Sequence, residues 1–582
     1  MASPVLSALF AAVSLLLSQS AAQNVSTFTN PIIPGFHPDP TCTFVPELNS
    51  TFFCTFSSFL TFPGLPIVAS RDLVNWKHIS NALSRPEQLP ALAFLPRGAT
   101  SGIYAPTLRY RDGTFYILST LANQALYPTN YTKWDNFIVT STDPYTSSSW
   151  SNPIHFDFPG IDPSPFWDDD GDGQAHIQGS IDGKSILQTQ IDLKTGEITG
   201  PLVAIWNGTG LPSPEAPHMY KKDGWYYLLT AEGGTRERHR ANMARSRNLY
   251  GPYEGAPANP LLSGYLTQSY FQAVGHADIF PDSQGNFWAI ALAVRAAYSY
   301  NFDPYNSIFP MGPATLPAQG EGYSPSGDDS INFEPGSKLP PHLFHWRLPV
   351  IKNYAISPAG DGNFDRTNSL MLRSSVLNLT AYDADSTRGR GQTFLARKQA
   401  HSRFRYSVDV SWAGLTRLEN EVGVSALQDQ AQHFDLGIVM LPSSQNRTDL
   451  EPHLRFRGIS TSTYRLPERF KYVDKATPFS SAMKDASKLR LQIEALNTTH
   501  YAFSAGCVNN EDADADVEMA VFGYAKGQNL IPYYSGVVVG VYATSNGKYG
   551  EGAFTTYVSR WRYTGLEQIS EFPEAQGPVV WD

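Results

Sequence analysis

The segment Lys222–Gly234, KDGWYYLLTAEGG, places a turn before a run of aromatic and apolar residues. Four similar segments start at Asn49 (NSTFFCTFSS), Asp112 (DGTFYILST), Asp170 (DGDGQAHIQGS) and Ser283 (SQGNFWAIALAVR). They recur at roughly 50 to 65 residues, about the length of one four-stranded propeller blade with its loops. The five copies predict a five-bladed β-propeller, and five unrelated hairpins are the alternative.

The composition supports a β-rich globular protein. The 582 residues include Lys+Arg 43 and Asp+Glu 53, which gives a formal net charge of −10. Because there is no run of Lys or Arg, we expect no nucleic-acid partner. Gly 45 and Pro 43, with 13% aromatic residues, favour turns and strands over helices. We therefore expect an all-β protein, and the length is typical of two or three domains.

The N-terminal region indicates secretion. Val5–Leu17 is apolar, too short to span a bilayer, and followed by small residues, which is typical of a signal peptide over residues 1–22. A buried N-terminal helix is the alternative. We expect an extracellular protein with no membrane partner, and seven glycosylation sequons agree with this location. Cys42 and Cys54 flank an expected hairpin and could form a disulfide, leaving Cys507 over.

A short segment lies upstream of each repeat, and each sets a polar or aromatic residue among prolines or small residues. The segments are FHPDPTC with Asp39, IYAPTLR with Tyr104, IDPSPFW with Asp162, SPEAPHMY with Glu215 and VGHADIF with His276. If each begins the innermost strand of a blade, all five meet at one end of the propeller axis. Propellers bind their ligands there.

Three of these five residues are carboxylates: Asp39, Asp162 and Glu215. Neighbouring prolines restrict the backbone and can hold each side chain in one direction. Like charges placed close together separate pKa values, so that one group stays protonated while another is ionised. Cleavage of a glycosidic bond needs such an acid and such a base. Ordinary turns at the Asp-Pro and Pro-Glu pairs are the alternative, and His276 could be a core residue, a metal ligand or a hydrogen-bond donor.

Taken together, NPIIPGFHPDPTC, GIYAPTLR, DPSPFW, PEAPHMY and YFQAVGHADI resemble glycoside hydrolase family 43 over roughly residues 28 to 315. The resemblance implies a five-bladed propeller that cleaves xylosidic or arabinosidic bonds with inversion. It implies Asp39 as general base, Glu215 as general acid, and Asp162 as the residue that orients the acid and modulates its pKa.

The same resemblance implies the substrate-binding residues. Phe59 and Tyr104 would stack on the sugar, with Tyr104 in place of the tryptophan usual in this motif. His276 matches a central histidine that often holds calcium or water in relatives. We therefore expect no required cofactor and no metal ligands, with a structural calcium ion near His276 as the alternative.

One motif departs from the family pattern. Relatives end the propeller with an M-G-R-E-T type motif whose arginine reaches the substrate, whereas this chain reads MGPAT and has Pro313 at that position. Proline offers neither a charge nor a donor. Arg295 is the nearest alternative guanidinium in the sequence.

The second half predicts a β-sandwich. Period-two strands are expected within FRYSVDVSW, FDLGIVML, KLRLQIEAL, SGVVVGVYA and AFTTYVSRW. We predict a propeller over residues 28–320, a linker over 321–341 and a sandwich over 342–582. This sandwich resembles the C-terminal domain of the xylosidase-like branch of the family. We favour a packing role over an independent carbohydrate-binding one.

These features predict a secreted, inverting glycoside hydrolase that removes xylose or arabinose from plant cell-wall polysaccharides or their oligosaccharides. Xylo- or arabino-oligosaccharides are the expected substrates, and β-xylosidase activity is favoured over α-L-arabinofuranosidase activity. The alternatives are an endo-arabinanase, a retaining fructan-active propeller, and a sugar-binding propeller with impaired catalysis.

Overall fold

The structure is a computed structural model, and it describes residues 30–95, 101–123, 134–171, 173–267, 269–295, 308–311, 322–358, 366–380, 391–460, 472–509, 516–530, 536–547 and 552–570. The predicted signal peptide and Pro313 lie outside these ranges. Within them, no helix is long and apolar enough to cross a membrane.

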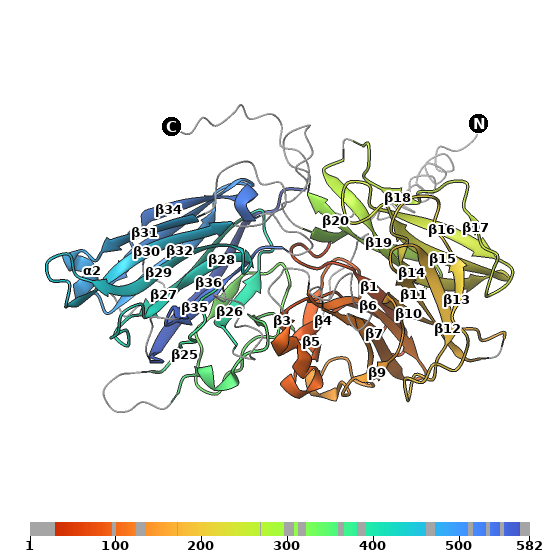
Figure 1. Cartoon of the computed structure of the whole chain (residues 1–582), viewed down its shortest axis with the longest axis horizontal. Coiled ribbons are helices and arrows are strands. Elements are labelled where there is room, and N and C mark those ends of the chain that lie inside the picture. The colour runs from red at the N-terminus through yellow and green to blue at the C-terminus, as the bar shows by residue number, and fades with distance from the viewer. Residues whose placement is uncertain are drawn as a thin grey trace, which may run out of the picture.

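The first half of the chain forms five antiparallel sheets, one for each blade of the propeller (Figure 1). The first two blades consist of β1 (Thr41–Val45), β2 (Thr51–Thr55), β4 (Gly64–Ser70) and β5 (Lys77–Leu83), and of β6 (Gly102–Arg111), β7 (Thr114–Ala122), β8 (Trp134–Ser141) and β9 (Ile154–Phe156). The third consists of β10 (Ile161–Trp167), β11 (Ala175–Ile181), β12 (Ser185–Gln190) and β13 (Val203–Trp206).

The fourth blade consists of β14 (Glu215–Lys222), β15 (Trp225–Glu232), β16 (Arg240–Ser246) and β17 (Glu254–Gly255), with β18 (Leu262–Ser263) also pairing to β16. The fifth contains β19 (Phe271–Pro281), β20 (Phe287–Arg295) and β21 (Ile308–Met311). The five repeated segments form the second strand of each blade (β2, β7, β11, β15 and β20), as predicted.

The turns inside the repeats explain why these residues form hairpins. Asp112–Gly113 joins β6 to β7, and Asp223–Gly224 joins β14 to β15; all four residues have positive φ. A two-residue loop with two left-handed residues is a type I′ turn, whose twist matches that of the strands on either side. The Asp-Gly pairs therefore set the register of the aromatic strands that follow.

The innermost strands β1, β6, β10, β14 and β19 contact one another in sequence order, and contacts between β1 and β19 close the ring. Apolar side chains fill the space between blades. Between the first and fifth blades they include Phe52, Phe280 and Ile290. Cys42 and Cys54 pair across β1 and β2 as a disulfide, which confirms that prediction, and Cys507 is a free thiol.

The second half forms two sheets that enclose one apolar core. One sheet consists of β24 (Tyr354–Ile356), β25 (Leu370–Arg373), β36 (Thr555–Glu567), β27 (Arg403–Ser411), β32 (Lys488–Ala495), β33 (His500–Val508) and β34 (Ala520–Lys526). β22 (Asp329–Ile331), within the predicted linker, pairs with β36 in this sheet. The five strands predicted for the sandwich are β27, β29, β32, β35 and β36.

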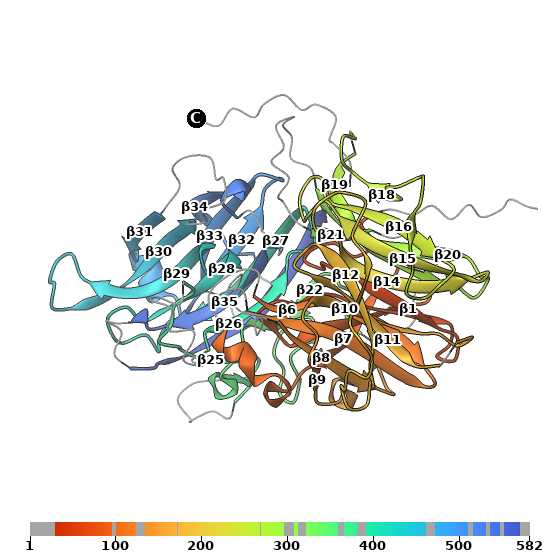
Figure 2. The ribbon, with the colours of Figure 1, turned by 45° about the vertical axis from the view of Figure 1, so that its right-hand side comes forward.

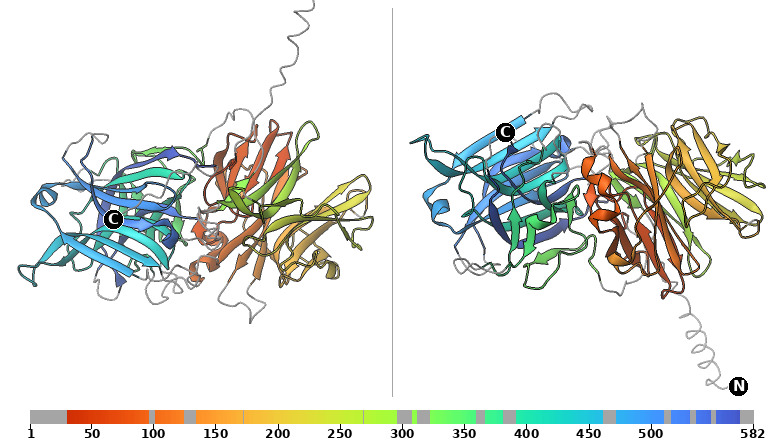
Figure 3. Two further views of the ribbon diagram at one scale, coloured as in Figure 1. Left: turned by 90° about the horizontal axis from the view of Figure 1, so that it is seen from above. Right: turned by 60° about the horizontal axis from the view of Figure 1, so that its bottom comes forward.

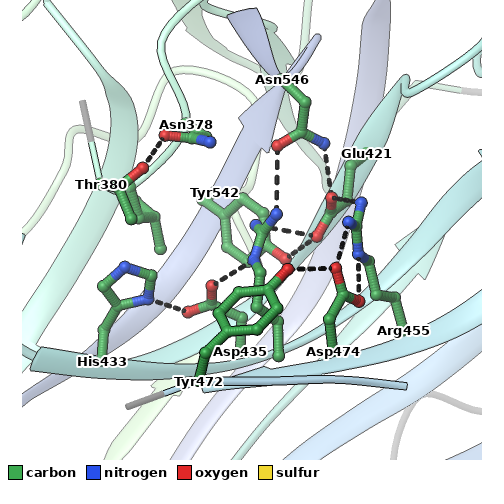
Figure 4. A network of polar contacts seen from close by, with 12 residues as sticks. Asn378, Thr380, Glu421, His433, Asp435, Arg455, Tyr472, Asp474, Tyr542 and Asn546 are labelled. Carbon is green, nitrogen blue, oxygen red and sulfur yellow. Dashed lines mark hydrogen bonds and ion pairs between the residues drawn. The ribbon is translucent and has the colours of Figure 1, made fainter. Parts of the chain in front are cut away.

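The other sheet consists of β23 (Phe344–Trp346), β26 (Thr393–Lys398), β35 (Val538–Thr544), β28 (Glu421–Asp429), β29 (Gln432–Pro442), β30 (Leu450–Ser460) and β31 (Tyr472–Pro478). Its face away from the core carries a buried polar network (Figure 4). Arg457 lies 3.3 Å from both Glu421 and Asp435, and Tyr542 donates to Glu421 at 2.5 Å. These buried charges are paired, as buried charges must be.

One strand joins the two domains. β3 (Thr61–Phe62) comes from the first blade region but pairs with β23, so the sandwich sheet extends to the propeller (Figure 1). The Leu60 carbonyl accepts a hydrogen bond from the backbone N–H of Arg347 at 2.8 Å. In Figures 2 and 3 the two domains lie side by side, and one apolar cluster, with Phe53 and Trp346, contains residues from both.

Candidate active site

Each innermost strand has an irregular step within it or just before it. A non-glycine residue with positive φ marks each step: Asp39 (53°) before β1, then Ala105 (25°), Asp162 (58°), Ala216 (52°) and His276 (45°), and β19 has a second such residue, Ala273 (50°). In four strands the register shifts here, between Tyr104/Thr107, Ile161/Ser164, Glu215/His218 and Gly275/Asp278. Such bulges re-aim side chains, and left-handed non-glycine residues concentrate at functional sites. Five of the six predicted site residues lie at or beside these steps, and Phe59 lies outside them.

Asp39 is oriented by three blades. Ser57 Oγ donates to Asp39 Oδ2 at 2.5 Å and accepts from the backbone N–H of Ala105 at 2.6 Å. His276 Nδ1 lies 3.3 Å from Asp39 Oδ1. The side chain therefore has one fixed direction.

Asp162 is buried, and its Oδ2 accepts from the backbone N–H of Ala216 at 3.0 Å. Burial raises the pKa of Asp162 to about 6; the charge of Asp39 adds to this effect, and His276 and the hydrogen bond oppose it. The hydrogen bond joins the third blade to the residue that follows Glu215.

Burial, together with the charges of Asp162 and Asp39, raises the pKa of Glu215 well above its ordinary value. Among the described residues, Glu215 Oε1 is buried with no hydrogen-bond partner. No hydrogen bond at this oxygen stabilises the ionised form. The raised pKa favours the protonated form, which a general acid needs.

Phe59 and Tyr104 contact each other. Their ring centroids are 5.4 Å apart, with an interplanar angle of 84°. Phe36 stacks on Phe59 at 5.6 Å, and Phe59 forms a bridge to Ile103. The structure thus brings the two predicted sugar-stacking residues together; Phe59 follows Ser57 by two residues, and Tyr104 precedes Ala105, whose backbone N–H binds Ser57.

A buried polar network that the sequence reasoning missed joins all five innermost strands. Arg109 donates to both oxygens of Asp278, at 2.8 and 3.0 Å, and Thr41 and Tyr220 donate to Asp278 at 2.7 Å each. His218 Nδ1 lies 3.2 Å from Arg109 and 3.0 Å from Ser164. Although burial raises the pKa of Asp278, the charge of Arg109 and these hydrogen bonds hold it below its ordinary value.

Among the described residues, the side chains around His276 do not supply a set of calcium ligands by themselves. Calcium takes six to eight oxygen ligands. The described residues contain no group of three His, Cys, Asp or Glu side chains placed to hold a metal, and Asp278 is engaged by Arg109. A calcium ion near His276 remains an expectation from the resemblance, and no step below depends on it.

A five-bladed propeller with three carboxylates at its centre, one of them with a strongly raised pKa, is the arrangement of a glycoside hydrolase, in which one carboxyl is the acid and another acts on the opposite face of the sugar. The chain belongs to the glycosyl hydrolases of family 43, whose model matches residues 28–311. A second model, the β-xylosidase C-terminal concanavalin A-like domain, matches residues 363–559.

Relatives support the same assignment. A non-reducing end α-L-arabinofuranosidase of Bacteroides ovatus is 30% identical over 542 residues, which cover 90% of this chain and 92% of that protein. A xylosidase/arabinosidase of Butyrivibrio fibrisolvens is 39% identical over 282 residues, 46% of this chain and 51% of that protein.

The fold also matches solved structures. A xylan β-1,4-xylosidase of Bacillus halodurans superposes with a TM-score of 0.75 at 23% identity, covering 92% of this chain and 100% of that one. The protein is a glycosidase of the β-xylosidase/α-L-arabinofuranosidase type and acts on xylose or arabinose residues.

Proposed function

We propose that this glycosidase is a secreted, inverting enzyme that removes terminal xylose from plant cell-wall polysaccharides or their oligosaccharides. The observation that carries the proposal is the environment of Glu215: its Oε1 is buried, and burial with the charges of two carboxylates raises its pKa. Terminal α-L-arabinofuranose is the second candidate, because the relative that matches nearly the whole chain is named for that activity.

In this mechanism Glu215 gives its proton to the glycosidic oxygen as the bond to the anomeric carbon breaks. The bonding electron pair stays on the departing oxygen. Asp39 takes a proton from a water molecule, whose oxygen attacks the anomeric carbon from the opposite face. Exchange with solvent then restores both protonation states.

The other site residues prepare this step. Asp162 contributes charge that helps to keep Glu215 protonated, and its hydrogen bond to Ala216 fixes the backbone beside the acid. Phe59 and Tyr104 stack on the sugar, and Ser57 aims Asp39 at the water. Inversion needs the two catalytic carboxyls roughly 6.5 to 9.5 Å apart, which leaves room for that water.

The test compares 4-nitrophenyl β-D-xyloside with 4-nitrophenyl α-L-arabinofuranoside, and includes a xylo-oligosaccharide. We expect xylose release by the wild type and a loss of about 10²- to 10⁴-fold on the oligosaccharide in Glu215→Gln. Glu197→Gln, at an exposed position, is the matched control and should keep full activity.

Proton NMR of the first product gives the stereochemistry. We expect α-xylose from the β-xyloside, and β-xylose would contradict inversion. Faster release from the arabinoside would favour the second candidate. Binding of xylo-oligosaccharide without any release would favour a sugar-binding propeller, and internal cleavage of arabinan an endo-arabinanase.

A further inference from the structure

A buried histidine that plays no part in the mechanism above lies beside the proposed acid. His239 follows the AEGG turn at the end of β15, and its side chain is 2% exposed. Its Nδ1 lies 4.0 Å from Glu215 Oε1. The turn itself is anchored by Glu232, a fully buried residue that accepts from the Thr209 backbone N–H at 2.9 Å and hydroxyl at 2.6 Å.

The tautomer of His239 is fixed by a backbone carbonyl. His239 Nδ1 lies 2.7 Å from the Gly234 oxygen, which can only accept, so Nδ1 carries the hydrogen. Burial, and then the charge of His276, lower the pKa of His239 to about 3. The ring is therefore neutral throughout the working pH range.

Two glycines make room for this arrangement. A Cβ atom on Gly275 would overlap the His239 ring, and a Cβ atom on Gly233 would overlap the Arg238 carbonyl. Gly233 has φ of 91° and donates its backbone N–H to the Pro212 carbonyl at 2.8 Å. The ring thus packs directly on the backbone of β19, one residue before His276.

This packing determines what Glu215 can contact. A hydrogen bond to the ionised form of a carboxylate lowers its pKa, and so does water. The Nδ1 hydrogen of His239 is given to the Gly234 carbonyl and not to Glu215 Oε1, which lies 4.0 Å from Nδ1, and the ring packs against Gly275. The other charged groups facing Glu215 are Asp162 and Asp39, which both favour its protonated form, and His276 faces His239.

We propose that His239 is a positioning residue: locked by Gly234 and packed on Gly275, its neutral ring lies beside the buried Oε1 of Glu215 without hydrogen-bonding to it, which favours the protonated acid that the leaving group needs. The proposal rests on the proposed role of Glu215 as general acid. It assigns the AEGG turn an indirect role in the reaction, through the position of His239.

The test is the pH profile of kcat/KM on a xylo-oligosaccharide, for the wild type, His239→Ala, His239→Phe and Gly275→Ala. His239→Ala admits water and should move the alkaline limb down by about one pH unit. Gly275→Ala displaces the ring and should move it in the same direction. His239→Phe keeps a neutral ring and should leave the limb within about 0.3 unit of the wild type.

Thermal melts identify variants that fail to fold. If His239→Ala fails to fold, His239→Gln is tested in its place. The glutamine amide can donate a hydrogen bond to Glu215, so this variant should also move the alkaline limb to lower pH. An alkaline limb that stays in place while the rate falls would show a merely structural role and overturn the proposal. An equal shift in His239→Phe would also overturn it.

The variant Glu215→Gln distinguishes a failure of the proposed general acid from a failure of the proposed role of His239. It is assayed on a 2,4-dinitrophenyl glycoside, whose leaving group departs without protonation. If the alkaline limb survives in Glu215→Gln, the proposed function fails. If Glu215→Gln loses the limb but His239→Ala leaves it unmoved, only the role of His239 is wrong.

Discussion

Arg109 and Asp278, 169 positions apart in the sequence, form a buried two-bonded ion pair that joins the second and fifth blades. Asp278 follows His276 by two residues on β19, so the pair lies one step along the strand from the proposed active site. Thr41 and Tyr220 complete the contacts of the carboxylate. The blades are thus held together by polar side chains where the backbone is most irregular.

Breaking this pair should destabilise the fold. Arg109→Met leaves Asp278 buried and charged without its partner, and we expect a loss of about 3 to 5 kcal/mol in the free energy of unfolding. Urea denaturation measures this. The double variant Arg109→Met/Asp278→Asn should recover part of the loss, and a double variant no more stable than the single one would contradict the explanation.

Replacing Asp162 should stabilise the protein at neutral pH. The folded pKa of Asp162 is raised to about 6, so folding binds a proton, and stability falls as pH rises from the unfolded pKa through the folded one. Asp162→Asn removes that cost. We expect it to be more stable than the wild type by up to about 3 kcal/mol at pH 7.5, with little difference at pH 3.5.

Thermal melts at both pH values test the sign. Asp282→Asn, in the turn before β20, is the control. In the wild type, hydrogen bonds overcome the effect of burial and lower the pKa of Asp282. Removing this carboxylate should therefore not increase stability at pH 7.5. A wild type more stable than Asp162→Asn at pH 7.5 would show that the carboxylate is stabilised by contacts beyond Ala216.

Ser57 should matter for turnover more than for binding. Its hydroxyl connects Asp39 to the backbone beside Tyr104, and Ser57→Ala removes both bonds. We expect kcat to fall by about 10- to 100-fold with KM changed less than threefold, because the base loses its orientation. Steady-state kinetics against Ser185→Ala, on β12, the third strand of the third blade, measure this; a rise in KM alone would place Ser57 in sugar binding.

Removing divalent ions should leave the enzyme active. Arg109 already provides the positive charge at Asp278, and the described residues hold no group of three metal ligands. After dialysis against EDTA we expect unchanged kcat/KM and melting temperature. A loss of activity that calcium restores would instead support the ion near His276.

The sequence was sufficient for features encoded within a short segment. Each turn with its aromatic strand identifies one hairpin, and each polar or aromatic residue set among prolines or small residues lies at the irregular step of an innermost strand. The sequence could not show which side chains form hydrogen bonds and ion pairs between blades. It did contain one signal of the buried polar network. When the five segments are aligned on the residues with positive φ, a polar residue stands two positions later in each, at Thr41, Thr107, Ser164, His218 and Asp278.

Two other features required the structure. No sequence motif singles out His239. Its proposed role depends on its contacts with the Gly234 carbonyl and with Gly275, which lies on a strand of the next blade. β3 is only two residues long, and its partner β23 lies nearly three hundred positions further along the chain. Two-residue strands give no hydrophobic period to detect.

The pairing of β3 with β23 limits how the two domains can be inherited or exchanged. Residues 57–62 run from the serine that aims Asp39, through Phe59, to the strand that completes the sandwich sheet. A sandwich domain taken from a relative must keep the strand register that pairs Thr61 with Trp346 and Phe62 with His345. A different register would displace the segment that carries Phe59 and Ser57. The two domains are therefore expected to evolve as one unit, with substitutions in β23 answered by substitutions around Phe59.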